Sequence, residues 1–133
     1  MLYRIDIENM KHTFYTDPKG FFTTTYNGSV SLEENRFIVE KMIEVVNGRM
    51  EAGKKAYILV DLTNLGEIDP GSLIYNAKAL KEIPVEHIAA VATNAAARTI
   101  IQTIINLSGE SKKMRMFGSR EEAERWLLEE MAV

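Results

Sequence analysis

The stretch from Asp61 to Leu73, DLTNLGEIDPGSL, is the part of the chain whose residue types and spacing come nearest to a known chemical motif. Gly66 and Gly71 are separated by four residues, as in the phosphate-binding loop GxxxxGK[ST], which lies between a strand and a helix. In that loop a lysine follows the second glycine and contacts nucleotide phosphates. Ser72 stands in the place of that lysine, so nucleotide hydrolysis is not expected here.

The same residues are well suited to begin a helix. Asp69 can accept amide hydrogen bonds as an N-cap, and Pro70 fits the first helical position, where the missing N–H costs nothing. Ser72 then falls in the first turn. Capping is sufficient to explain the sequence DPGS, and binding of an anion or a partner at this helix end would be an additional role.

Other catalytic or metal-binding patterns are weak. The chain has two histidines, His12 and His87, and neither has a second histidine or a cysteine three or four residues away. Ser72, His87 and Asp61 can be combined on paper as a catalytic triad, but no GxSxG elbow supports a nucleophilic serine. We therefore expect no metal, no cofactor and no enzymatic activity.

Two short apolar runs, Tyr57 to Leu62 and Ile88 to Ala92, predict interior strands that are buried on both faces. Each run is followed by a predicted helix, the first over residues 70–81 and the second over 95–107, before Gly109. Alternation of strands and helices predicts parallel pairing with right-handed crossovers.

The flanking parts of the chain carry clear start and turn signals. The sequence DPKG at residues 17–20 suits a type I turn between two antiparallel strands. Ser31 with Glu34, and Ser119 with Glu122, have the spacing of capping boxes. The further elements that we predict are strands at 2–7, 12–15, 21–26 and 114–117, a helix from Ser31 to about Gly53, and a helix that starts at Ser119.

Ligands of open α/β sheets usually bind beyond the carboxyl ends of the strands. Two interpretations of the polar residues in this place are open: helix capping with solvated loops, or a binding edge for a partner loop or a small anion. The candidate residues are Asp61, Thr63, Asn64, Asp69 and Ser72 after the first interior strand, and Thr93, Asn94 and Arg98 after the second.

The composition is that of an ordinary globular protein. Of the 133 residues, 46% are hydrophobic and 26% are charged, which is enough apolar material for one core. A net charge of -3 offers no attraction for nucleic acid. The absence of cysteine fits a reducing compartment, and no stretch approaches the ~20 apolar residues of a membrane span. We expect one domain over residues 1–133, located in the cytoplasm, with no transmembrane segment.

The order of elements and the stretch DLTNLGEIDPGSL resemble the STAS domain of anti-sigma-factor antagonists. In that family an interior strand ends in Asp-Leu-Ser, and Ile-Asp-Ser-Ser-Gly-Leu begins the next helix; residues 61–63 and 68–73 occupy those places. The sequence AVATNAAA at 90–97 resembles the penultimate strand and helix entry. MRMFGSREEAERWL at 114–127 resembles the end of the SpoIIAA-like, SEC14-related branch. The resemblance implies an α/β fold with a mixed sheet of five or six strands and four helices.

The sequence departs from the family at the phosphorylation site. In the switch members of the family, the first serine after the aspartate accepts the phosphate, and Pro70 holds that position here. Proline has no hydroxyl, so phosphorylation at this position is excluded. Ser72 is a substitute candidate, because a phosphate in the first turn of a helix is stabilised by the helix dipole.

The predicted helix over 95–107 has more isoleucine than one core-facing stripe requires. At 100° per residue its large apolar side chains cover an arc of roughly 160°, compared with ~100° for a typical stripe. Burial, a self-association or partner surface, and the lipid-holding groove that the SEC14-like resemblance suggests are the three interpretations. Ile101 and Ile105 are the candidate interface residues.

The resemblance implies a function as well as a fold. We expect a non-enzymatic bacterial regulatory module that binds a protein partner, with a homodimer as a further candidate assembly. The alternative is a small carrier of lipid or another apolar ligand.

Overall fold

The computed structural model describes residues 11–133, so the predicted strand at 2–7 lies outside the described residues. Five strands form one sheet in the order β1-β2-β3-β4-β5. β1 is antiparallel to β2, and the other neighbouring strands are parallel. The strands are β1 (Thr13–Thr16), β2 (Phe22–Val30), β3 (Tyr57–Ile68), β4 (His87–Val91) and β5 (Met114–Phe117).

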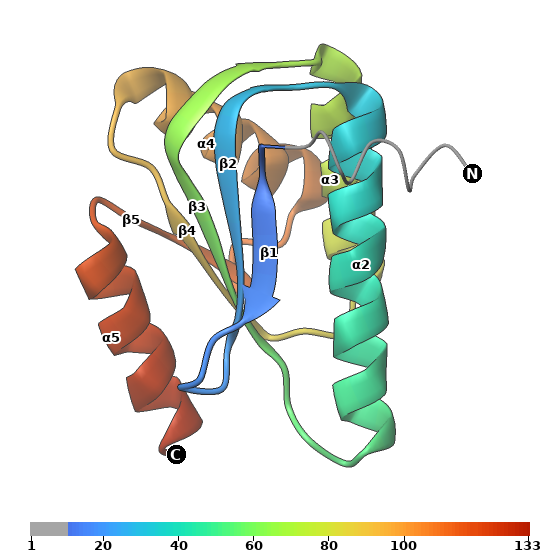
Figure 1. Cartoon of the computed structure of the whole chain (residues 1–133), viewed down its shortest axis with the longest axis vertical. Coiled ribbons are helices and arrows are strands. Elements are labelled where there is room, and N and C mark those ends of the chain that lie inside the picture. The colour runs from blue at the N-terminus through green and yellow to red at the C-terminus, as the bar shows by residue number, and fades with distance from the viewer. Residues whose placement is uncertain (1–10) are drawn as a thin grey trace.

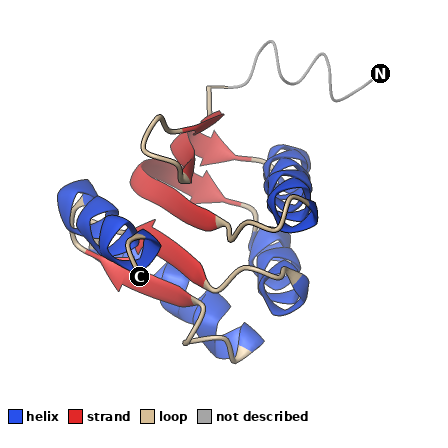
Figure 2. Ribbon diagram, turned by 90° about the horizontal axis from the view of Figure 1, so that it is seen from below, coloured by secondary structure: helices blue, strands red, loops and turns tan. Residues whose placement is uncertain are grey.

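Four helices cover the two faces of this sheet (Figure 2). The first three each connect two successive parallel strands, and because the strands are added in one direction, right-handed crossovers place these helices on the same face. The last helix packs against β3 and β4 from the other face. The helices are α2 (Leu32–Glu51), α3 (Pro70–Glu82), α4 (Ala95–Ser108) and α5 (Arg120–Met131).

The predicted start signals mostly act as expected. The Ser31 hydroxyl accepts a hydrogen bond from the Glu34 amide at 3.1 Å, and the Ser31 amide donates to the Glu34 carboxylate at 3.0 Å, which completes a capping box. At Ser119 only one half of the predicted box forms, from the Glu122 amide to the Ser119 hydroxyl at 3.2 Å. The turn at 17–20 is closed by the Gly20 amide, which donates to the Asp17 carbonyl.

β3 is longer than predicted, and this changes the region of the candidate site. The prediction ended the strand at Leu62, whereas β3 continues to Ile68 and pairs with β2 well past the end of β4. The two strands bend together toward the starts of α2 and α3 (Figure 1). The prediction was wrong because Asn64, Gly66 and Glu67 have low strand propensity, and their strand conformation comes from pairing with β2. We call residues 62–68 and their partners in β2 the β2–β3 ribbon.

Two irregularities shape the β2–β3 ribbon, and each places an extra residue on β3. The first lies between the pairs Thr25–Asp61 and Asn27–Asn64. The second lies near Gly66, where a Cβ atom would come within 3.0 Å of the β2 backbone. Bulges of this kind increase the local twist and bend of the strand that carries them. They therefore account for the turn of the ribbon away from the plane of the sheet.

Candidate functional site

The predicted binding edge is divided into two groups. Asp61 pairs with Val91, the last residue of β4, so Asp61 lies beside the exit of that strand. Asp69 follows the far end of the β2–β3 ribbon, and at ~3.3 Å per residue it is roughly 25 Å along the strand from Asp61. The edge as predicted from sequence is therefore not one continuous site, because the extended strand separates its parts.

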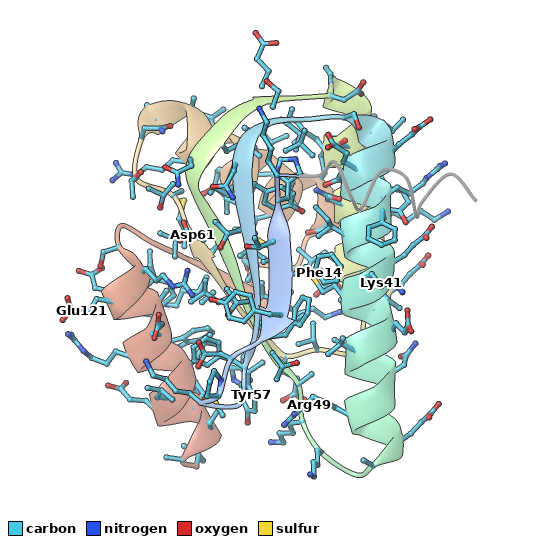
Figure 3. All side chains as sticks on the ribbon, viewed as in Figure 1. Phe14, Lys41, Arg49, Tyr57, Asp61 and Glu121 are labelled. Atoms are coloured by element: carbon cyan, nitrogen blue, oxygen red, sulfur yellow. The ribbon has the colours of Figure 1, made fainter. Side chains whose placement is uncertain are left out.

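The Asp61 carboxylate makes its contacts with other residues of the fold. It is buried, and its Oδ1 atom accepts hydrogen bonds from the Thr63 amide at 2.9 Å and the Thr63 hydroxyl at 2.6 Å. These two bonds span the first bulge of β3. The Oδ2 atom of Asp61, a residue labelled in Figure 3, lies 3.5 Å from Nη1 of Arg120 at the start of α5. The carboxylate therefore stabilises the bulge and the position of α5.

Arg120 is a central residue that the sequence reasoning missed. Besides Asp61, it donates to the Tyr15 hydroxyl at 3.0 Å and to the Glu124 carboxylate at 2.9 Å. Lys19, in the turn between β1 and β2, binds the other Glu124 oxygen at 2.8 Å. The hydrogen bond from Lys19 is the main cause that holds the pKa of Glu124 below its usual value. We call these five residues the α5 network. The sequence signals only the i,i+4 pair Arg120–Glu124 within α5, because the other three residues come from three separate elements.

The residues after β4 mainly begin α4. Asn94 is the N-cap, and its side-chain oxygen accepts a hydrogen bond from the Ala97 amide at 2.8 Å. Arg98 is exposed and reaches back to the Ala92 carbonyl at 3.4 Å. Thr93 is exposed. On the neighbouring ribbon, Asn64 donates to the Asn27 side chain at 3.3 Å.

The start of α3 has the predicted cap. The Asp69 carboxylate accepts a hydrogen bond from the Gly71 amide at 2.8 Å, and Pro70 occupies the first helical position. Ser72, by contrast, is fully buried, and its hydroxyl has no hydrogen-bond partner among the described residues. A kinase or a partner needs an accessible side chain. This burial therefore conflicts with Ser72 as a phosphorylation site or an exposed contact in the folded protein.

The isoleucines of α4 are used for packing. Ile101 is buried in the core with Leu62 and Ala90, and Ile105 is partly buried against the same cluster. Ile101 is therefore not a surface residue, contrary to its candidate role in an interface. α4 needs a wide apolar arc because it packs on the sheet and also against α3. The exposed large hydrophobic side chain of this helix is that of Leu107.

The outer side of α4 is poor in charge, whereas the charged residues of α3, Lys78, Lys81 and Glu82, all follow Ile74. Ile74 is 69% exposed and follows the exposed Pro70 by one turn. On α4, Arg98 is the one charged residue in a helix of 14 residues. We define the α3–α4 surface by exposed residues of two helices that pack against each other: Pro70 and Ile74 of α3, and Ala96 and Thr99 of α4. Ile74 lies three residues before the buried Ala77, a spacing that predicts the same helix face, so the sequence pattern did not identify this surface.

An apolar cavity of about 80 Å³ lies on the inner side of α3. Its floor is formed by β3 through Val60 and Leu62, and its α3 wall by Asn76, Ala79 and Leu80. The cavity exists because α3 packs chiefly against α2 and α4 and makes few contacts with the strands. Side chains of α2 and α4 close its sides.

A pair of amides lies between α2 and α3. The Asn35 side chain donates to Asn76 at 2.7 Å, and the Asn76 side chain donates to Asn35 at 3.1 Å. Asn35 is fully buried, whereas Asn76 also lines the cavity. Among the described residues that line this cavity, Tyr26 and Asn76 are the two with a polar side-chain group.

The structure does not assemble the catalytic triad considered from sequence. His87 lies at the amino end of β4, where its Nε2 atom is 3.3 Å from the Glu130 carboxylate, whereas Asp61 lies opposite the carboxyl end of that strand. Ser72 belongs to a helix on the other face of the sheet from α5 and Asp61. Over residues 11–133, no three histidine or acidic side chains are grouped so as to hold a metal ion.

In the described part of the chain, no helix has both the length and the apolar content that crossing a bilayer requires. No curated protein matches the sequence. A solved structure is similar: an uncharacterized protein from the DUF3478 family with a SpoIIAA-like fold, from Shewanella loihica PV-4. It matches with a TM-score of 0.61 and 13% identity, over 87% of this chain and 91% of that chain. The predicted SpoIIAA-like α/β fold, with a mixed sheet of five or six strands and four helices, is confirmed, and residues 11–133 form five strands.

A family model described as "Domain of unknown function (DUF7793)" matches residues 21–130, and the chain therefore belongs to this family.

Proposed function

We propose that the protein is a non-enzymatic regulatory module of the STAS type that acts in the cytoplasm and binds a protein partner through the α3–α4 surface. The SpoIIAA-like fold supports a STAS-type module. The polar groups at the carboxyl edge support the absence of catalysis, because Asp61, Asp69 and Asn94 are bound to backbone amides of their own segments. A catalytic site needs a free nucleophile beside a base.

The observation that carries the proposed binding surface is the exposure of Ile74. Its β-branched apolar side chain is 69% exposed, and a partner that covers this side chain is bound more tightly because apolar surface is removed from water. The neighbouring α4 contributes one charged residue in 14, although 26% of the whole chain is charged. The centres of protein interfaces are depleted of charge, because charged groups lose hydration when they are buried. The α4 part of the α3–α4 surface has this character, whereas α3 carries an exposed lysine, Lys78, one turn after Ile74.

Regulation at this surface would differ from that of the phosphorylated STAS proteins that the sequence resembles. Pro70 cannot accept a phosphate, and Ser72 is buried. We propose that partner binding is controlled by the availability of the partner, with the α3–α4 surface always ready to bind.

A photo-crosslinking amino acid at position 74, compared with one at Met50, tests this proposal in cells of the native host. Met50 is 48% exposed at the far end of α2 and serves as the matched position. The identified partner is then titrated against purified variants. Ile74→Glu is expected to weaken binding about tenfold or more, because it places a charge in the contact. Met50→Glu should leave the affinity unchanged.

Two results would contradict the proposal. One is equal crosslinking from positions 74 and 50. The other is an affinity for the identified partner that Ile74→Glu does not change. A second copy of the chain is also a candidate partner, because a homodimer was a candidate assembly from the sequence. The mass of the purified protein in solution tests this case.

Binding of a small apolar ligand is a second candidate function. The cavity beneath α3 is the observation that favours it. A cavity of about 80 Å³ is small for the long chains of a membrane lipid, so the ligand would differ from that of a lipid carrier.

A further inference from the structure

The size of the cavity beneath α3 limits its ligand. Its volume is about 80 Å³. A single buried water needs only ~10–15 Å³, and an engineered apolar cavity of ~150 Å³ binds benzene or xenon. A compact molecule of about four to six non-hydrogen atoms fits between these limits. Larger molecules would require α3 to move away from β3.

The chemistry of the lining limits the ligand further. Of the described residues around the cavity, none carries a charge. A carboxylate or an ammonium group placed there would lose its hydration without gaining an opposite charge, which is unfavourable. The lining therefore selects against ions and phosphorylated molecules of the same size.

Asn76 supplies a hydrogen-bonding group inside this apolar space. A primary amide has two N–H donors and an oxygen with two lone pairs. The pairing with Asn35 uses one donor and one lone pair of Asn76. Within residues 11–133 its second N–H group and its second lone pair are unused. One hydroxyl or amide group of a ligand can bind there.

The ends of the cavity suggest how a ligand enters. Leu65 and Ile68 line the cavity from the far part of the β2–β3 ribbon, and both are half-buried. The inner end, at Ile83 and Ile88, is buried. A molecule can therefore enter between the ribbon and α3, with its apolar end directed inward.

We propose that this cavity binds a compact, uncharged molecule that has a short apolar body and one hydrogen-bonding group, such as a short-chain alcohol or amide. The inference rests on the second candidate function and names its ligand class. Asn76 binds the polar group, and Val60, Leu62 and Leu80 surround the apolar body.

Butan-1-ol and butyrate are the paired probes, because they have similar size and differ in charge. Methyl NMR spectra of the full chain would follow Met42 and Met114, which line the cavity. Butan-1-ol should shift both methyl signals saturably, and it should bind about tenfold or more tightly than butyrate, which would have to lose the hydration of its charge. Palmitate is the third probe and represents a long-chain lipid.

Filling the cavity provides the matched control. Ala79→Leu adds three carbon atoms to the α3 wall and should weaken butan-1-ol binding about tenfold or more, because the ligand space is occupied. Lys78→Leu places an apolar side chain at the neighbouring position, which is exposed, and should leave butan-1-ol binding unchanged. If the Ala79→Leu variant does not fold, the smaller substitution Ala79→Val is tested in its place.

The outcomes separate the ligand class from the function. If palmitate shifts the cavity methyl groups and butan-1-ol does not, the ligand class is wrong and apolar-ligand binding stands. If no probe gives saturable shifts, or if the Ala79 variants bind like the wild type, the cavity is an unfilled packing defect and both ideas are overturned. The crosslinking at Ile74 is independent of all these results.

Discussion

The two faces of the sheet are built differently. On the α5 face, Leu59, Val91 and Leu127 are fully buried in one cluster, and the α5 network surrounds it with hydrogen-bonded charges. On the other face, three helices cover a larger apolar area, but α3 does not rest closely on the strands and a cavity remains. The comparison indicates that α5 contributes stability, whereas the face covered by α3 has space for binding.

The largest expected effect is on core packing. Leu127→Ala on the α5 face should reduce the free energy of unfolding by about 3 to 4 kcal/mol, because the closely packed site cannot collapse around the lost atoms. Leu80→Ala, beside the existing cavity, should cost only about 2 kcal/mol, since one side of Leu80 already lacks neighbours. Urea unfolding measures both. Equal losses would mean that the two faces are equally well packed.

A smaller effect is expected from the buried hydroxyls. Thr23 on the α5 face and Ser72 on the other face each have a buried hydroxyl without a partner among residues 11–133. Thr23→Val and Ser72→Ala should each raise the free energy of unfolding by about 1 kcal/mol, because an unsatisfied polar group is removed. Thr24→Val is the control, since Thr24 donates to the Thr13 carbonyl at 3.1 Å and its loss should destabilise. Destabilisation by Ser72→Ala would indicate that the hydroxyl does have a partner.

The smallest effect concerns the α5 network. The pKa of Glu124 is lowered, chiefly by the hydrogen bond from Lys19, so the folded state favours the ionised carboxylate. The resulting stabilisation is present above the ordinary pKa of 4.5 and is lost as the pH falls through the lower folded value. Glu124→Gln should therefore cost about 0.5 kcal/mol at pH 7 and less at pH 3.

Unfolding at both pH values, with the exposed Glu129→Gln as a control on the same helix, measures this difference. A cost of Glu124→Gln that is the same at pH 7 and pH 3 would show that the network contributes no pH-dependent stability.

Local signals in the sequence predicted the helices and their caps well. Asp69, Asn94 and the Ser31–Glu34 pair act within one turn of their own helix, so their roles depend on neighbouring residues alone. The parallel order of β3 and β4 also followed from the alternation of strands and helices. The candidate site was predicted less well. Its residues were named, but their separation along β3 and the burial of Ser72 were not foreseen.

The sequence by itself therefore determined which segments are helices or interior strands, where most of them begin, and that Pro70 cannot be phosphorylated. Only the tertiary structure decided the length of β3, the partners of Arg120 and the cavity beneath α3. The physical reason is the range of the interactions. Caps and periodicity act over a few residues, whereas strand pairing, ion-pair networks and packing gaps depend on segments that are far apart in the chain and meet only after folding.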